Sequence, residues 1–152
     1  MLFSTHILLG IFFFLLAEPF FSGNEILFLF FVMVGSILPD IDEKHSKASR
    51  WTGLLGSTIS FFSKHRGFFH SLFFVVIITL PTKFFLNELY AWALFLGLTS
   101  HLLGDSLTKK GLPILYPFPF RVKGWLKTDG WGERFIQVFV LVFLIIKITK
   151  AF

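Results

Sequence analysis

With 152 residues and no cysteine, the chain is long enough for one domain and has neither disulfides nor thiolate metal ligands. Hydrophobic residues make up 55% of it and charged residues 15%, whereas a soluble domain has roughly 25% charged residues. The composition therefore excludes an ordinary soluble domain. It predicts a single all-α integral membrane domain over residues 1–152, in which the position of the charges matters more than the net charge of +5.

Apolar runs at residues 2–17, 26–38, 68–85, 89–107 and 135–148 predict about five transmembrane helices. A helix that crosses about 30 Å of hydrocarbon needs about 20 residues, so the first, second and last runs are short for a complete span. Some of their ends should lie at or below the interface. The first run lacks a basic n-region and a small-residue cleavage site, so we interpret it as a retained span and not as a signal peptide.

Charges on the connecting segments predict the orientation in the membrane. Residues 40–67 and 109–134 are rich in Lys and Arg, whereas residues 18–25 contain acids and no base. The positive-inside rule puts the N-terminus and both long loops in the cytoplasm, and it fits the plasma (inner) membrane. Apolar residues repeat at helical spacing within 47–63, which predicts an interfacial helix. The proline-rich stretch 111–131 should be irregular.

Histidines and aspartates gather at those ends of the runs that face the cytoplasm in this topology. One pair of acids ends the second run, two histidines flank the start of the third, and a His-x-x-x-Asp pair ends the fourth. Residues four apart lie on one face of a helix. Each motif alone has an ordinary explanation, such as a capped histidine or a loop acid. Together they predict one metal site with the candidate ligands His6, Asp40, Asp42, His65, His70, His101 and Asp105.

Mixed imidazole and carboxylate donors suit Zn²⁺, with Mn²⁺ and Fe²⁺ as alternatives. Seven donors exceed what one catalytic zinc ion needs, so we expect a dinuclear site, which is typical of phosphoester hydrolysis. Arg66 can hold a phosphoryl oxygen through its guanidinium group. We take Arg66 and Asp42 as the candidate catalytic residues, and Asp40, Asp42 and Glu43 stay open as general acid or base.

These motifs resemble those of the YdjM-like, membrane-bound, metal-dependent hydrolases. The matching segments are Thr5-His6, Leu-Pro-Asp-Ile-Asp at 38–42, His-Arg-Gly-x-x-His-Ser at 65–71, and His-x-x-x-Asp at 101–105 followed by Thr108 and Gly111. The chain departs from the family at residues 43–44, which read Glu-Lys in place of His-Pro, and at Phe69, where threonine is common. The resemblance implies a small multi-span hydrolase.

We expect a hydrolase that cleaves an amphiphilic phosphoester, such as a lipid, at the cytoplasmic interface. Its partners would be membrane lipid and a small amphiphilic substrate, with no nucleic acid. A metal or proton transporter is one alternative, although no run of ionisable residues crosses the middle of the spans. A non-catalytic anchor with basic loops is the other, and it predicts dispensable histidines. The sequence defines neither the oligomeric state nor the bond cleaved.

Overall fold

The computed structural model describes residues 1–43, 46–54, 56, 58 and 66–151, and within them the fold is all helical. The long helices are α1 (Phe3–Ala17), α2 (Glu25–Ile37), α5 (Leu72–Phe85), α6 (Glu88–Ser106) and α7 (Trp131–Ala151). The short ones are η1 (Glu18–Phe20), η2 (Leu38–Asp42), α3 (Lys47–Trp51) and η3 (Phe68–His70). Each predicted apolar run forms a long helix, so the all-α prediction is confirmed.

Polar side chains fix where three of these helices begin. The Asn24 side chain accepts a hydrogen bond from the Leu27 amide at 3.1 Å, and Asn87 caps α6 in the same way. The Ser71 hydroxyl accepts from the Phe74 amide at 3.2 Å. Because Ser71 is an extended N-cap residue, α5 starts at Leu72 and not at residue 68 as the apolar run suggested.

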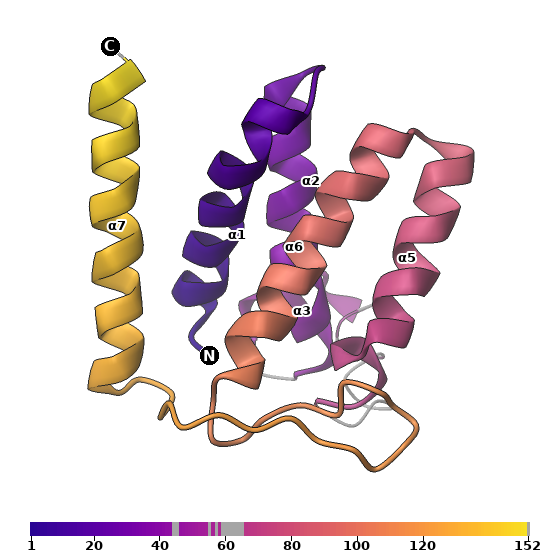
Figure 1. Ribbon diagram of the computed structural model, residues 1–152. Coiled ribbons are helices and arrows are strands. Elements are labelled where there is room, and N and C mark those ends of the chain that lie inside the picture. The colour runs from indigo at the N-terminus through magenta and orange to yellow at the C-terminus, as the bar shows by residue number, and fades with distance from the viewer. Residues whose placement is uncertain (44–45, 55, 57, 59–65, 152) are drawn as a thin grey trace.

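A close crossing of α2 and α6 lies at the centre of the bundle, in the middle of Figure 1. Gly35 and Gly97 meet there: a methyl group at Gly35 would lie 2.7 Å from the Leu94 carbonyl oxygen, and one at Gly97 would collide with the Val32 carbonyl. Small residues allow two helix backbones to approach in this way. The crossing brings the end of α2 against the last turns of α6.

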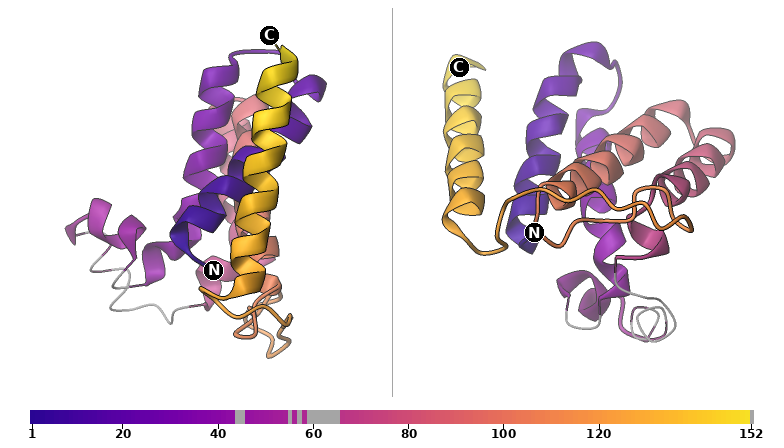
Figure 2. Two further views of the ribbon diagram at one scale, coloured as in Figure 1. Left: turned by 90° about the vertical axis from the view of Figure 1, so that its left-hand side faces the viewer. Right: turned by 60° about the horizontal axis from the view of Figure 1, so that its bottom comes forward.

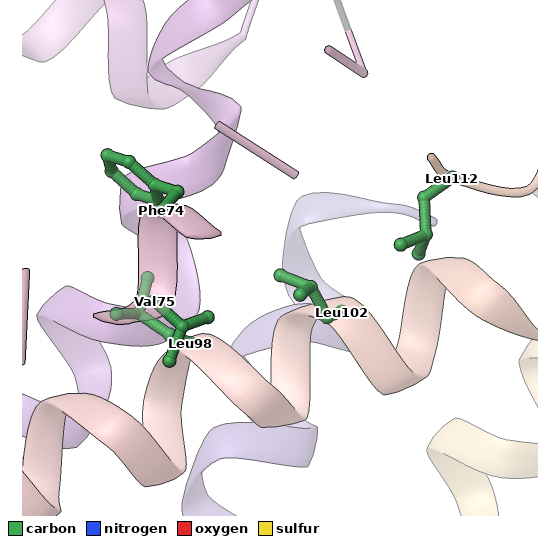
Figure 3. Packing of buried hydrophobic residues seen from close by; sticks show 5 residues of the cluster. All are labelled: Phe74, Val75, Leu98, Leu102 and Leu112. Atoms are coloured by element: carbon green, nitrogen blue, oxygen red, sulfur yellow. The ribbon is translucent and has the colours of Figure 1, made fainter. Parts of the chain in front are cut away.

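One apolar core cluster lies between α5 and α6 and extends into the segment after α6, and a second lies between α1, α2 and α6. Val75 of α5 packs with Leu98 and Leu102 of α6, and Leu112 closes the cluster from the loop side (Figure 3). α7 lies beside α1 at the edge of the bundle (Figure 1, Figure 2). The first of these clusters fixes the C-terminal end of α6 relative to η3 and to the loop.

The segment 107–130 is irregular, as its prolines predicted. Isolated bridges join Leu112 to Val122 and Thr108 to Leu126, and the segment lies at the same end of the bundle as the N-terminus (Figure 1). The predicted interfacial helix is represented by α3, which stops before Gly53 with its positive φ of 58°. Residues 55, 57 and 59–63 of that prediction lie outside the described residues.

Large apolar side chains cover much of the outer surface of the bundle, including Phe84 of α5 and Phe135 and Ile145 of α7. Among the described residues, one stretch, Phe3–Phe20, is long and apolar enough to cross a membrane by length and composition. The helix Leu72–Phe85 is apolar but shorter. The bundle therefore has an apolar exterior, whereas its most deeply buried side chains include histidines and aspartates.

Candidate metal centre

The candidate ligands come together from four elements at one end of the bundle. His6 lies in the first turns of α1, Asp40 in η2, His70 at the end of η3, and His101 with Asp105 in the last turns of α6. All are buried, except that the side chain of Asp40 is 13% exposed. Ionisable groups are rarely buried together unless they are paired or bind an ion.

Three donor atoms of this cluster form a triangle of the size that a metal ion requires. The His70 and His101 Nε2 atoms are 3.3 Å apart, and each lies 3.7 Å from the Asp40 Oδ1 atom. Donors about 2.1 Å from a tetrahedral zinc ion are separated by about 3.4 Å. Two overlapping triads, His6 with Asp40 and His101, and His70 with His101 and Asp105, can hold a metal ion.

His101 is oriented by the backbone of α2. Its Nδ1 atom lies 2.8 Å from the Ser36 carbonyl oxygen. Because a carbonyl only accepts, Nδ1 carries the hydrogen and Nε2 has a free lone pair that faces the cluster. His101 can therefore bind one ion at most.

His6 lies directly over the His101 ring. The two rings stack at a centroid separation of 3.7 Å and an interplanar angle of 9°. Neither ring nitrogen of His6 has a hydrogen-bond partner among the described residues, although its Nε2 is 3.5 Å from the Asp105 Oδ1 atom. An unsatisfied buried imidazole is costly, so His6 fits a ligand better than it fits a structural core residue.

Carboxylates surround both nitrogens of His70. Its Nδ1 atom is 3.3 Å from Asp42 Oδ2, while Nε2 faces Asp40 and lies 3.7 Å from Asp105 Oδ2. Burial lowers the pKa of His70, but hydrogen bonds with Asp40 and Asp42 outweigh that effect and raise the pKa to about 9. Burial raises the pKa of Asp40, but the neighbouring His70 and His101 hold it well below its ordinary value. The raised pKa favours a protonated His70 ring in the metal-free protein.

Arg66 fixes the Asp105 carboxylate. Its Nη2 atom donates to Asp105 Oδ1 at 2.8 Å, and Nη1 donates to the Thr108 hydroxyl and the Gly111 carbonyl at 3.0 Å each. The Met1 amine also contacts Oδ1. Arg66 adopts a left-handed φ of 57°, which a non-glycine residue keeps only where its surroundings hold it in place. Its buried Nε–H has no partner in the described part of the chain.

The structure places five of the predicted ligands in one cluster and Asp42 directly beside them. His6, Asp40, His70, His101 and Asp105 lie together as predicted, whereas His65 lies outside the described residues. Asp42 lies on the Nδ1 side of His70 and accepts the Arg66 amide at 3.2 Å. That position suits a carboxylate that orients a ligand histidine.

Sequence reasoning missed Glu133, a fully buried carboxylate of α7. It accepts hydrogen bonds from the Leu2 amide at 2.6 Å, the Thr5 hydroxyl at 2.7 Å and the Asp129 amide at 2.7 Å. These contacts fix the first turn of α1, which carries His6. An acid that opens an apolar run gives no signal of a partner 128 residues away.

The known proteins similar to this chain include one from the family that the sequence motifs resemble. A family model described as YdjM inner membrane protein matches residues 1–151. The chain belongs to this family. The Bacillus subtilis strain 168 protein named "Uncharacterized protein YvsG" is 31% identical over 136 residues, which cover 88% of this chain and 85% of that protein. The Escherichia coli strain K12 protein named "Inner membrane protein YdjM" is 32% identical over 117 residues, or 70% of this chain.

The match spans 59% of the length of that Escherichia coli relative. No solved structure matches the chain. The chain is thus a YdjM-family membrane protein with a buried His and Asp cluster that can bind a metal ion. The cluster offers imidazole and carboxylate ligands, a guanidinium group and a dry surrounding, and this combination can polarise a phosphoryl or carbonyl group.

Proposed function

We propose that this protein is a metal-dependent hydrolase that cleaves a phosphoester bond of an amphiphile at the cytoplasmic face of the inner membrane. The observation that carries the proposal is the triangle of His70, His101 and Asp40 donor atoms, with sides of 3.3 and 3.7 Å, at one end of a bundle with an apolar exterior. A structural ion-pair network does not need three donor atoms at the spacing of metal ligands. Membership in an inner membrane protein family supports the location.

Zinc is the ion that the donor set fits best, because neutral imidazoles and a carboxylate are its common catalytic ligands. When bound, it would supply an activated water and polarise the phosphoryl oxygen. His70, His101 and Asp40 would hold one ion. His101 has a single free nitrogen and would serve one ion, so a second ion would depend on other residues. His6 and the Oδ2 atom of Asp105 are the remaining ligands for it.

The residues around the donors have separate tasks in this proposal. Asp42 would hold the His70 ring through Nδ1, and Arg66 would hold Asp105 through Nη2. The Nε–H of Arg66 remains for a phosphoryl oxygen of the substrate. Burial of all these groups limits competing water and strengthens their electrostatic effect on the reacting phosphorus centre.

The five long helices would all cross the membrane, some of them with short hydrophobic spans. Exposed apolar side chains on α5 and α7 support contact with lipid. The N-terminus and the segment 107–130 lie at the same end as the cluster, while the C-terminus lies at the other (Figure 1). The basic residues of the long loops favour a cytoplasmic position for the end of the bundle that carries the cluster.

Hydrolysis of p-nitrophenyl hexadecyl phosphate in phosphatidylcholine vesicles would test the proposal. Water attack on phosphorus breaks the bond to nitrophenolate, which is measured by its absorbance. We expect turnover by the zinc-loaded wild type and loss of it after chelation and in a His70→Ala, His101→Ala double variant. Metal-loaded wild type that is no faster than the double variant would overturn the proposal and favour a non-catalytic anchor.

A further inference from the structure

An apolar groove lies directly behind the turn that carries the aspartates. It has a volume of about 340 Å³ and runs between the second half of α2, η2 and α3. Its walls include Met33 and Ile37 of α2, Ile41 of η2, and Ala48 and Trp51 of α3. Among the described residues that line it, Thr52 is the only one with a hydroxyl or charged group. This volume is within the range of about 300–1,000 Å³ of sites for small ligands.

The groove and the candidate metal centre lie on two sides of the same turn, η2. Ile41 lines the groove, and its neighbours Asp40 and Asp42 face His70. The Ser46 hydroxyl donates to the Asp40 carbonyl at 2.6 Å and also caps α3 by accepting from the Ser49 amide at 2.9 Å. These two bonds fix the α3 wall of the groove relative to the metal ligands.

The turn is also the most accessible side of the cluster. The Asp40 side chain is 13% exposed, whereas His6, His70, His101 and Asp105 are at most 1% exposed. Asp40 is therefore the cluster residue nearest to solvent, and its neighbour Ile41 lines the groove.

Charge near the groove favours an anionic occupant. Lys47 and Arg50 of α3 are exposed, and no ion pair engages Arg50 among the described residues. Lys47 lies over the Phe3 ring at 5.0 Å, and the Trp51 side chain at the groove is 71% exposed. Basic and aromatic side chains together are typical of the headgroup layer. No acid lines the groove within the part of the chain that the structure describes.

A second apolar hollow differs from this groove in its position and in the pairing of its charges. The hollow between α5 and α6, of about 190 Å³, is at the other end of these helices from the cluster. Its charged lining residues Lys83 and Glu88 pair with each other at 2.9 Å, so it offers no unpaired cation. The groove beside η2 combines apolar walls, exposed positive charge and a position next to the turn that carries Asp40 and Asp42.

We propose that this groove binds the hydrocarbon chain of an anionic, single-phosphate amphiphile while its phosphate group lies at Asp40 and the metal centre. The proposal rests on the proposed function, because it assigns the groove to the substrate of that site. It goes further by naming the position of the chain and by requiring a substrate with a long alkyl group.

The test is photolabelling with hexadecyl phosphate that carries a diazirine on its chain. The purified full-length protein is reconstituted in phosphatidylcholine nanodiscs, irradiated and digested, and the labelled peptides are mapped by mass spectrometry. We expect concentrated labelling within residues 30–52 that excess unlabelled hexadecyl phosphate removes.

Ala48→Phe should fill the groove and abolish this competable labelling. Ala91→Phe is the matched control, because Ala91 lines the second hollow and both alanines are 6% exposed. Val34→Phe fills the groove from α2, so it serves as a second variant if Ala48→Phe fails to fold. Labelling spread over all lipid-facing helices, or unchanged in both groove variants, would overturn the proposal.

Turnover of p-nitrophenyl hexadecyl phosphate separates the two proposals. Turnover without groove labelling would refute binding of the alkyl chain in the groove and support the hydrolase function. Competable groove labelling without turnover refutes the hydrolase and supports the binding of an anionic amphiphile.

Discussion

Metal affinity should rise with pH, because binding displaces a proton from His70. In the metal-free protein, the Asp40 and Asp42 carboxylates raise the pKa of His70 from 6.5 to about 9. A metal needs the Nε2 lone pair, so between pH 7 and 9 each binding event releases about one proton. The apparent affinity should rise about tenfold per pH unit, or about a hundredfold over this range, which equals about 2.7 kcal/mol.

The substitution Asp42→Asn tests whether the proton on His70 sets this pH dependence. It removes the carboxylate 3.3 Å from His70 Nδ1 but keeps the shape of the side chain. The pH at which zinc affinity stops rising should move below that of the wild type. Asp129→Asn is the control, since that side chain is 64% exposed and pairs with Arg134 at the surface.

The assay is competition for zinc against a chelator from pH 6 to 9.5, with calorimetry in two buffers to count released protons. Affinity that is flat between pH 7 and 9, or an Asp42→Asn profile identical to that of the wild type, would refute the reasoning. The same pairing stabilises the metal-free fold. Because the folded-state pKa is raised, this stabilisation is present below about pH 6.5 and is lost as the pH rises through about 9.

Three further substitutions test the packing around the cluster. Gly97→Leu should destabilise the detergent-purified protein by at least about 1–3 kcal/mol in thermal unfolding, since a side chain there collides with α2; an unchanged unfolding temperature would contradict the close crossing. Glu133→Ala should weaken the affinity for the second zinc ion about tenfold because His6 loses its support, and unchanged affinity for that ion would show that α7 does not position His6. Arg66→Lys keeps the charge but loses the bonds to the Thr108 hydroxyl and the Gly111 carbonyl. We expect this variant to lose about 1–3 kcal/mol of unfolding free energy. A variant as stable as the wild type would show that these two bonds do not stabilise the fold.

The sequence predicted the meeting of the ligands because topology and chemistry pointed to the same end. Acids that end one run and histidines that begin the next must share a face if the runs alternate in direction. His70, His101 and Asp40 lie together for this reason. The start of α5 was harder to predict, because the cap at Ser71 sets it whereas the apolar run begins earlier, at residue 68.

Roles within the cluster could not be predicted from residue type. Asp40 and Asp42 are two apart in a 3-10 turn, and only their distances to His70 distinguish the one that faces Nε2 from the one that faces Nδ1. The support of His6 by Glu133 joins residues at opposite ends of the chain. The orientation of His101 depends on the Ser36 backbone, and a backbone contact is independent of the residue type at that position.

Elemental analysis of the detergent-purified protein tests most directly the central claim that the cluster binds a metal ion. The wild type is compared with the His70→Ala, His101→Ala double variant and with Asp129→Asn. Our expectation is one to two equivalents of zinc, manganese or iron in the wild type and the control, and none in the double variant. Wild type without metal after reconstitution, or a double variant with the same metal content, would contradict it.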